Sequence, residues 1–258
     1  MSEPTLQVTF LGTGTSQGVP VIACDCEVCR SLDFHDKRLR TSILIRAAGQ
    51  TLVVDTGPDF RQQMLRESVT QLDAVLFTHA HKDHTAGLDD VRAFNFRQGA
   101  DMPIYGTRNT HDQLRAEFHY AFEPNAYPGI PRLQLKEIDQ KPFQVGPLKV
   151  TPLPVMHLNL PVLGFRIGSF SYITDANYIS EETIALVKGS TVLVLNALQR
   201  EKHVSHFNLE EAIAISRRMG VPLTYFTHMS HKMGLHGTVE TEMPEGIRLA
   251  FDGLTISV

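Results

Sequence analysis

Histidine and aspartate residues, which can bind metals, directly follow short apolar runs in this chain. This feature restricts the possible folds more than any other. The apolar run at residues 74–77 leads through Thr78 into the segment His79-Ala80-His81-Lys82-Asp83-His84. Residues at strand ends project into loops, which are the usual place for binding sites. A fold that brings several such strand ends together would concentrate these side chains at one edge.

Short β-branched runs recur along the chain and have the lengths of strands. They occupy residues 6–10, 42–45, 52–54, 74–77, 148–151, 170–174, 192–195, 223–226 and 254–258. The clearest helical pattern covers residues 209–219, where Asn208 and Glu211 form a start signal and Gly220 supplies the stop. Further helices are expected over residues 181–188, from about residue 59, and over residues 108–119.

The 258 residues carry no long linker, repeat or low-complexity tract. A chain of this length can bury a substantial core. The stretch at residues 124–131, rich in Pro and Gly, is predicted to be a loop. We predict one α/β (α+β) domain over residues 1–258, with its sheets covered by helices.

Charge and hydropathy limit the partners of the chain. A formal net charge of −4 gives no general attraction for nucleic acid. Apolar runs stay below the roughly 18 residues that cross a bilayer. Residues 1–4 lack the basic and apolar regions of a signal peptide. We therefore expect a cytoplasmic protein that binds neither membrane nor nucleic acid.

The cluster at residues 79–84 contains four potential ligands for divalent metals. His79 and His81 are two apart, which puts both rings on one side of an extended chain, and Asp83 and His84 lie on the following turn. Imidazole and carboxylate suit Zn²⁺, Mn²⁺ or Fe²⁺. One catalytic ion must keep a position open for water, so four ligands here indicate two ions. A polar, histidine-rich surface loop is the alternative.

The pattern His-x-His-x-Asp-His after an apolar strand resembles the signature of the metallo-β-lactamase superfamily. Asp55, His157, Asp175 and His228 also follow apolar runs, in the order typical of that family. The resemblance covers nearly the whole chain. It implies a four-layer αββα sandwich in which two sheets face each other, with the site at the edge where strand-end loops meet.

The resemblance further implies two ligand sets. The first is His79, His81 and His157, and the second is Asp83, His84 and His228. Asp175 would bridge the two ions, and Asp55 would orient a ligand from behind. Two ions about 3.5–4 Å apart can share a hydroxide that attacks the substrate. Taken singly, His157 and His228 have the alternative of histidines satisfied by backbone at a strand end.

Two features resemble the phosphodiesterase branch of the superfamily, which includes tRNase Z and the PhnP-type phosphoribosyl cyclic phosphodiesterases. The glycine-rich run at residues 9–20 is one of them, and it lacks the Lys-Ser/Thr of a phosphate loop, so a tight turn is expected. The other is His206, which in that branch would pair with an acidic ligand, here Asp83, and in protonated form assist the leaving group. The alternative is a histidine near a helix cap without a chemical role.

The cysteines form a separate cluster. Cys24, Cys26 and Cys29 are odd in number and closely spaced, so they favour a metal site over disulfides. Structural zinc takes four ligands. His231 is the best candidate for the fourth, an arrangement that also resembles the PhnP type, and His35 and His236 are rivals. Thiols without a metal are the alternative.

These features predict a dinuclear metal-dependent hydrolase, with a small phosphodiester, cyclic ones included, as the favoured substrate. The cofactors would be two catalytic ions, Zn or Mn with Fe as a further candidate, and one structural Zn. The aromatic-rich segment at residues 94–131 is expected to shape the pocket wall, with the alternative that its aromatic side chains belong to the core, which is the more frequent case.

Two alternatives remain open. One is a thioesterase, lactonase or lactamase with the same dinuclear site. The other is a non-enzymatic protein similar to the pyrroloquinoline quinone protein B. The sequence is compatible with a monomer and with a homodimer.

Overall fold

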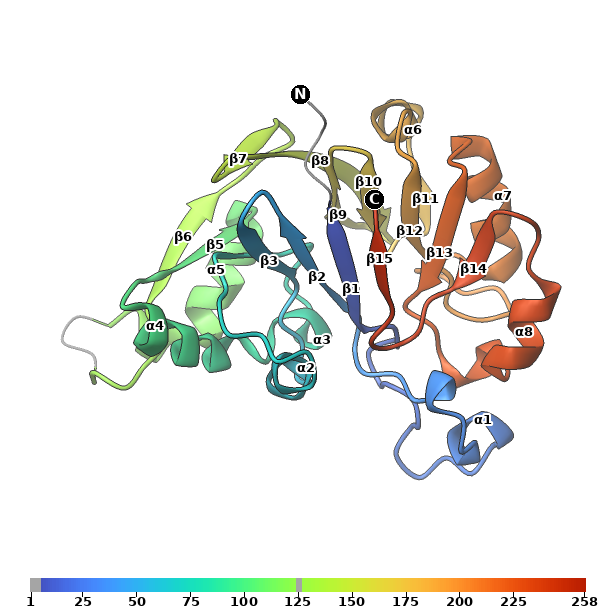
Figure 1. Ribbon diagram of the computed structural model, residues 1–258, viewed down its shortest axis with the longest axis horizontal. Coiled ribbons are helices and arrows are strands. Elements are labelled where there is room, and N and C mark those ends of the chain that lie inside the picture. The colour runs from blue at the N-terminus through green and yellow to red at the C-terminus, as the bar shows by residue number, and fades with distance from the viewer. Residues whose placement is uncertain (1–5, 124–126) are drawn as a thin grey trace.

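Two mixed sheets face each other in the computed structural model, which describes residues 6–123 and 127–258 (Figure 1). Residues 1–4, which in the sequence lack the features of a signal peptide, lie outside the described residues. Residues 124–126, part of a predicted loop, lie outside them as well. In spatial order, the first sheet consists of β15 (Thr255–Ser257), β1 (Gln7–Gly12), β2 (Ser42–Ala47), β3 (Gln50–Val54), β4 (Ala74–Leu76), β5 (Met102–Gly106) and β6 (Leu133–Glu137). The second consists of β11 (Tyr178–Ile179), β8 (Leu148–His157), β9 (Leu160–Ile167), β10 (Phe170–Ile173), β12 (Val192–Asn196), β13 (Leu223–Thr227) and β14 (Ile247–Leu249), with β7 (Phe143–Val145) on β8.

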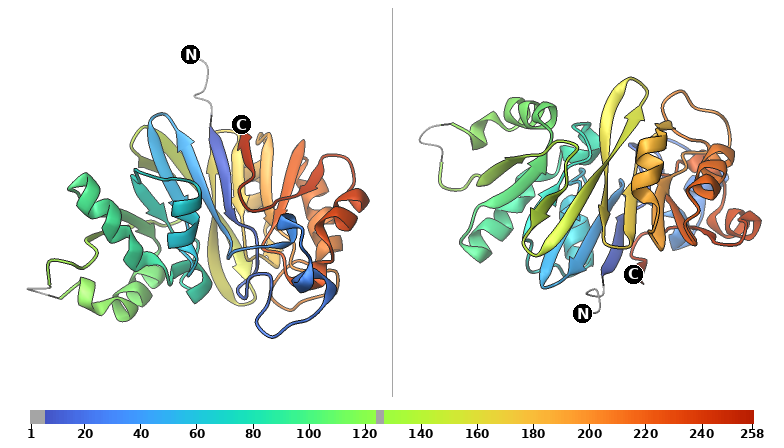
Figure 2. Two further views of the ribbon diagram at one scale, coloured as in Figure 1. Left: turned by 60° about the horizontal axis from the view of Figure 1, so that its bottom comes forward. Right: turned by 90° about the horizontal axis from the view of Figure 1, so that it is seen from above.

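Helices form the two outer layers (Figures 1 and 2). On the side of the first sheet lie α2 (Phe60–Arg66), α3 (Lys82–Thr85), α4 (Arg92–Gln98) and α5 (Arg108–Glu117). On the side of the second lie α6 (Glu181–Val187), α7 (Leu209–Met219) and α8 (His236–Glu242). The predicted αββα sandwich is therefore confirmed. Within the described ranges, no helix is long and apolar enough to span a membrane.

Short helical turns complete the chain. The N-terminal segment carries α1 (Glu27–Arg30) and the 3₁₀ turn η1 (Phe34–Asp36), and Figure 1 shows this segment beside α8. The other 3₁₀ turns are η2 (Leu88–Val91), η3 (His119–Ala121) and η4 (His231–Met233).

Hydrophobic packing separates the layers. Phe10, Phe165, Tyr172 and Val194 are buried in the core between the sheets. A second core lies between the second sheet and its helices, and a third between the first sheet and α2–α5. Full burial of one large apolar side chain contributes about 1.5–3 kcal/mol, so these three cores hold the strand ends in place.

Each sheet has a parallel part, and this explains where the polar residues gather. β3, β4, β5 and β6 run parallel, as do β10, β12, β13 and β14. The carboxyl ends of parallel strands meet at one edge, where ligands usually bind. Asp55, the segment at residues 79–84, Asp175 and His228 follow such strand ends.

The predicted bounds of helix α7, residues 209–219, are confirmed. Asn208 accepts a hydrogen bond from the Glu211 N–H and Glu211 closes a capping box, while Gly220 ends the helix at a φ of 67°. Strand β8 differs from its prediction, because it continues beyond residue 151 and contains His157 as its last residue. Pro152 and Pro154 lie between the stretches that pair with β7 and β11, so their missing N–H groups cost no ladder bond.

Several elements carry patterns too weak to predict. The apolar pattern of strand β9 is broken by Pro161 and Gly164, although the strand itself is continuous, and the edge strand β6 carries polar side chains on most positions. The short helices α4 and α8 likewise have no start signal of the kind seen at α7, since no side chain caps either of them. Tertiary packing compensates for this weak local preference.

Candidate metal centres

Three strand ends adopt an unusual backbone conformation. Asp55, Asp175 and His228 have φ values of 65°, 56° and 58°. Residues other than glycine rarely occupy this left-handed region, and such strain clusters at functional sites. The sharp turns aim two carboxylates and one imidazole into the same space at the edge of the sheets.

The predicted ligands assemble into two groups. His79, His81 and His157 form one, and Asp83, His84, Asp175 and His228 form the other. Within each group the ligand atoms lie within 4.8 Å of one another. All the residues that the sequence predicts for the catalytic pair therefore come together, although they are up to 149 positions apart in the chain (His79 to His228).

Asp175 lies between the two groups. Its Oδ1 is 3.2 Å from His228 Nε2 and 3.5 Å from His84 Nε2. Its Oδ2 is 4.0 Å from His79 Nε2. One carboxylate thus faces both groups, as the shared role implied by the resemblance would require.

Asp55 contacts Thr78 and His84 and so positions the segment at residues 79–84. Its carboxylate accepts hydrogen bonds from the Thr78 N–H (2.9 Å) and the Thr78 hydroxyl (2.8 Å), and it lies 2.7 Å from His84 Nδ1. This contact leaves His84 Nε2 facing Asp83, 3.2 Å away. Gly57 allows the close approach, because a Cβ there would collide with the carbonyl oxygen of Asp83. Carboxylate–histidine pairs of this kind orient metal ligands.

The Nδ1 nitrogens of two further ligands, which point away from the predicted metal positions, also have hydrogen-bond partners. His157 Nδ1 donates to the carbonyl oxygen of Ser205 at 2.8 Å. His79 Nδ1 lies 3.0 Å from the Thr78 hydroxyl, which itself donates to Asp55. Since each outward nitrogen carries the proton, the Nε2 lone pairs point into the ligand sets.

The inward nitrogens fit a metal. Within residues 6–123 and 127–258, the buried Nε2 atoms of His79, His84 and His228 have no hydrogen-bond partner. Leaving buried polar atoms unpaired costs about 1–3 kcal/mol each. Divalent ions would satisfy all three, so this donor set fits the predicted dinuclear centre.

The protonation states of His79 and Asp175 agree with this assignment. Burial lowers the pKa of His79 well below its usual value, which keeps the ring neutral. Burial alone would raise the pKa of Asp175, but the imidazoles of His228 and His84 lower it well below the usual range. Neutral imidazole and ionised carboxylate are the forms that bind metals. For His84, burial alone would lower the pKa, but the carboxylates of Asp175, Asp83 and Asp55 raise it well above its usual value, so an ion bound there would displace a proton.

His206 lies beside this centre, with a different partner from the one expected. Its Nε2 is 3.3 Å from Asp175 Oδ2, whereas the sequence favoured Asp83 as the acidic partner. The reason is tertiary: the Phe207 N–H donates to the carbonyl of Ala176, which ties His206 to the turn after Asp175. Burial lowers the pKa of His206 to about 4, and the protonated form implied by the resemblance stays a prediction.

The sequence analysis did not identify two residues that support the centre. Asn196 accepts from the Ala176 N–H (2.8 Å) and donates to the Ala176 carbonyl (2.9 Å), which holds the strained turn after Asp175. Ser205 contacts His157 and His206. An asparagine closing an apolar run was the one available signal, and a serine in a polar loop gave none.

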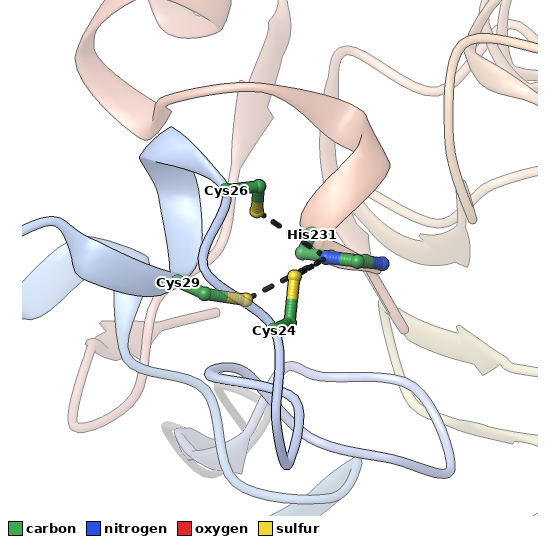
Figure 3. Close-up of side chains that lie close together, drawn as sticks. All are labelled: Cys24, Cys26, Cys29 and His231. Carbon is green, nitrogen blue, oxygen red and sulfur yellow. Dashed lines mark hydrogen bonds between the residues drawn. The ribbon is translucent and has the colours of Figure 1, made fainter.

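The cysteine cluster is a second, separate centre (Figure 3). Cys24, Cys26 and Cys29 place their sulfur atoms 3.2, 3.4 and 3.5 Å from His231 Nδ1. The Cys29 backbone N–H lowers the pKa of Cys26 to about 6, whereas burial raises that of Cys29 to about 11. Three sulfurs and one imidazole nitrogen are a complete donor set for structural zinc.

The rival histidines are engaged elsewhere. His35 Nδ1 lies 2.6 Å from Asp33, and His236 Nδ1 lies 3.1 Å from Arg38 Nη2. The rings of His35 and His236 stack on each other with centroids 4.8 Å apart. The structure therefore favours His231 as the fourth ligand.

The glycine-rich N-terminal run joins the two centres. It forms a turn in which the Gly18 N–H donates to the Thr15 carbonyl. Its backbone pairs with Met229, since the Met229 N–H donates to Thr13 and the Thr15 N–H donates to Met229. The predicted tight turn is therefore present, and because Met229 follows His228, it lies beside one of the predicted ligands.

The aromatic segment bears out the core alternative for two of its members. Phe94 and Phe118 are buried in the core between the first sheet and its helices, so they do not line a substrate pocket. Phe96 and Tyr127 are exposed instead, at 65% and 77%. Aromatic content alone does not distinguish core from pocket.

Known proteins agree with this geometry. Residues 50–229 match the beta-lactamase superfamily domain. The chain is 43% identical over 252 residues to an octanoyltransferase of Porphyromonas gingivalis, covering 96% of this chain but only 51% of that relative. It is 26% identical to a ribonuclease Z of Mycolicibacterium gilvum, covering 86% of this chain and 84% of the relative.

A solved structure extends the similarity over the full fold. A diphosphatase from the PhnP family superimposes with a TM-score of 0.93 at 37% identity, covering 98% of this chain and 97% of that one. The match of the superfamily domain includes the strand ends that carry Asp55, Asp175 and His228. This chain therefore belongs to the metallo-β-lactamase superfamily, in the branch of the PhnP proteins and tRNase Z.

Proposed function

We propose that this protein is a metal-dependent hydrolase that cleaves a phosphorus–oxygen bond in a small phosphodiester or diphosphate. The observation that carries the proposal is the position of Asp175 between two groups of potential metal ligands. A pair of divalent ions suits the in-line displacement at phosphorus. The similarity to a PhnP-family diphosphatase and to a ribonuclease Z supports the same bond type.

The residues divide the work as follows. His79, His81 and His157 would hold one ion, and Asp83, His84 and His228 the other, with Asp175 shared. Bound Zn²⁺ or Mn²⁺, or alternatively Fe²⁺, would supply a low pKa for water and neutralise charge on the phosphoryl oxygens. His206 Nε2, beside Asp175, would donate a hydrogen bond to the leaving oxygen. Asp55 would keep the histidine segment in register.

The cysteine cluster would hold one structural zinc. Its four donors, Cys24, Cys26, Cys29 and His231, leave no ligand position for substrate. Metal analysis should therefore find one tightly bound zinc and a more readily exchanged pair. A single tight zinc without the pair would favour a binding protein over an enzyme.

A small molecule is the favoured substrate. The net charge of −4 disfavours a polyanionic partner. Octanoyl transfer is not part of the proposal, because the chain spans about half of the relative that bears that name.

The test is hydrolysis by metal-free protein reloaded with Mn²⁺, Zn²⁺ or Fe²⁺. Bis-p-nitrophenyl phosphate, a diphosphate ester, a thioester and a lactone are offered in parallel, with Asp175→Asn as the inactive control. We expect turnover of the phosphorus substrates with at least one metal. Turnover of the thioester or lactone alone would reject the proposal in favour of an acyl hydrolase.

A further inference from the structure

His228 is held differently from the other buried histidines of the centre. Nδ1 of His79, His84 and His157 lies at most 3.0 Å from a protein oxygen. Neither ring nitrogen of His228 has a hydrogen-bond partner within residues 6–123 and 127–258, although the side chain is buried. The ring is stacked, with centroids 4.9 Å from His206 and 6.0 Å from His84. Since no hydrogen bond fixes this ring, its position depends on the backbone that carries it.

The backbone next to His228 pairs with the glycine-rich run near the N-terminus. The φ of His228 is 58°, a strained conformation that persists only when the surrounding structure supports it. The Met229 N–H donates to the Thr13 carbonyl at 2.9 Å, and the Thr15 N–H donates to the Met229 carbonyl at 3.1 Å. Both backbone groups of the residue after the ligand are therefore paired with residues 13–15.

The opposite edge of residues 13–15 is paired as well. The Gly14 N–H donates to the Leu39 carbonyl at 2.8 Å, and the Thr41 N–H donates to the Gly14 carbonyl at 3.0 Å. A Cβ at Gly14 would lie only 2.9 Å from the Arg38 carbonyl oxygen, so the two segments are in close contact. Residues 13–15 thus lie between residues 38–41 and Met229, and a shift of these residues would move the backbone after His228.

The Thr13 hydroxyl binds a buried guanidinium and a largely buried carboxylate. It donates to Asp252 Oδ1 at 2.8 Å and accepts from Arg38 Nη1 at 2.8 Å. Arg38 also donates to the Ala250 carbonyl at 2.7 Å, and Asp252 Oδ2 accepts from the Leu39 N–H at 2.7 Å. Hydrogen bonds to charged groups are stronger than neutral ones. This one hydroxyl therefore anchors the glycine-rich run to two other segments of the chain.

We propose that Thr13 is a positioning residue, which fixes the glycine-rich run and, through it, the backbone of the metal ligand His228. This inference rests on the proposed function, in which His228 holds one of the two ions. The connection is short, because the Thr13 carbonyl accepts directly from the residue after His228. Without the hydroxyl this carbonyl loses its anchor, and His228 Nε2 no longer keeps its place 3.2 Å from Asp175 Oδ1. The ion at His228 then binds more weakly.

The test is zinc binding by protein stripped of its exchangeable ions, measured without substrate. Nitrogen NMR of the histidine rings separates the two ions, since His84 and His228 report one of them and His79 and His157 the other. For Thr13→Val, which keeps the shape but not the hydroxyl, we expect the Kd of the ion at His228 to rise about 10-fold, as for the loss of other outer partners of metal ligands. The Kd of the ion at His157 should stay close to the native value.

Three further variants separate positioning from a general loss of structure. Thr13→Ser keeps the hydroxyl and should restore the native Kd. Thr9→Val is the matched control, because it removes another buried hydroxyl of the N-terminal segment, one whose partner is the Thr255 hydroxyl at 2.8 Å, and both Kd values should stay native. Asp252→Asn keeps an acceptor for Thr13 but removes its charge, so it should weaken the ion at His228 by a smaller factor.

Selective weakening of the ion at His228 in Thr13→Val, reversed in Thr13→Ser, would support the proposal. Unchanged binding of both ions, equal weakening of both, or the same effect in Thr9→Val would overturn it. If Thr13→Val does not fold, Asp252→Asn decides the question by the same criteria. If the native protein bound both ions but cleaved no phosphorus substrate, and the weakening were selective, the proposed reaction would fail and the role of Thr13 would stand.

Discussion

The two candidate metal centres are built in opposite ways. The cysteine centre takes three of its four ligands from six consecutive residues, Cys24 to Cys29, in a loop outside the sheets. The histidine and aspartate centre collects its ligands from the ends of strands in both sheets, with strained backbone at Asp175 and His228. The first is a closed sulfur-rich set, and the second is a nitrogen and oxygen set whose member His81 is exposed.

This difference indicates that local sequence can build a structural metal centre, whereas a catalytic centre depends on the tertiary structure. A closed set can stabilise a loop but has no position for a reactant. An open set requires ligands that the rest of the fold holds in place, because substrate must take the remaining positions. We therefore expect damage to the first centre to affect stability and damage to the second to affect turnover.

The largest effect should follow from Asp175→Asn or His79→Ala. Loss of a shared or directly coordinating ligand removes metal assistance of several kcal/mol, so kcat/KM should fall by about 1000-fold or more. His119→Ala, an exposed histidine of η3, is the matched control and should retain activity. Circular dichroism should show a retained fold, and native turnover in either ligand variant would contradict the assignment.

Cys29→Ser should break the other centre. If the Kd for zinc lies about 1000-fold below the free zinc concentration, loss of the ion lowers the free energy of unfolding by about 4 kcal/mol. For a chain of this size that corresponds to a fall in Tm of roughly 8–16 °C. Calorimetry with metal analysis measures both quantities. Turnover per folded molecule should stay within about tenfold, and abolished turnover in a folded variant would break the division between the centres.

Asp55→Asn should have an intermediate effect. The amide can still accept from Thr78 but no longer offers a carboxylate to His84 Nδ1. Loss of such an outer partner typically costs about 10–100-fold in metal affinity or activity. Titration of the metal-free variant with Zn²⁺ checks the affinity, and an unchanged binding curve would argue that Asp55 serves the fold alone.

The smallest effect concerns the pH dependence of stability, through His236 and Arg38 near the cysteine centre. Burial, aided by the charge of Arg38, lowers the pKa of His236 to about 4, below the unfolded value of about 6.5. As pH falls from 6.5 to 4 the unfolded chain takes up this proton first, so the free energy of unfolding decreases. His236→Asn can still accept from Arg38 and should lose stability less steeply over this window. Urea unfolding at several pH values tests this, and parallel curves would contradict it.

Part of this protein could be predicted because the relevant signals are local. Helix α7 shows both of its caps within the segment itself, at Asn208 and Gly220. The ligands in residues 79–84 are dense enough to be recognised without any tertiary contact. Strand β8 was only half predicted, because the consequence of Pro152 and Pro154 depends on which neighbours pair with β8.

By itself, the sequence determined the chemical character of the two centres: imidazole and carboxylate after apolar runs, and three thiols in one loop. Local periodicity and caps indicated the individual strands and helices, and the family resemblance implied their arrangement in four layers. Only the tertiary structure decided that Asp175 lies beside His206 and that Ser205 contacts both His157 and His206. The contacts of Asp175 with His206 and of Ser205 with His157 join residues 31 and 48 positions apart. Their distances follow from the packing of whole sheets, which no local pattern encodes.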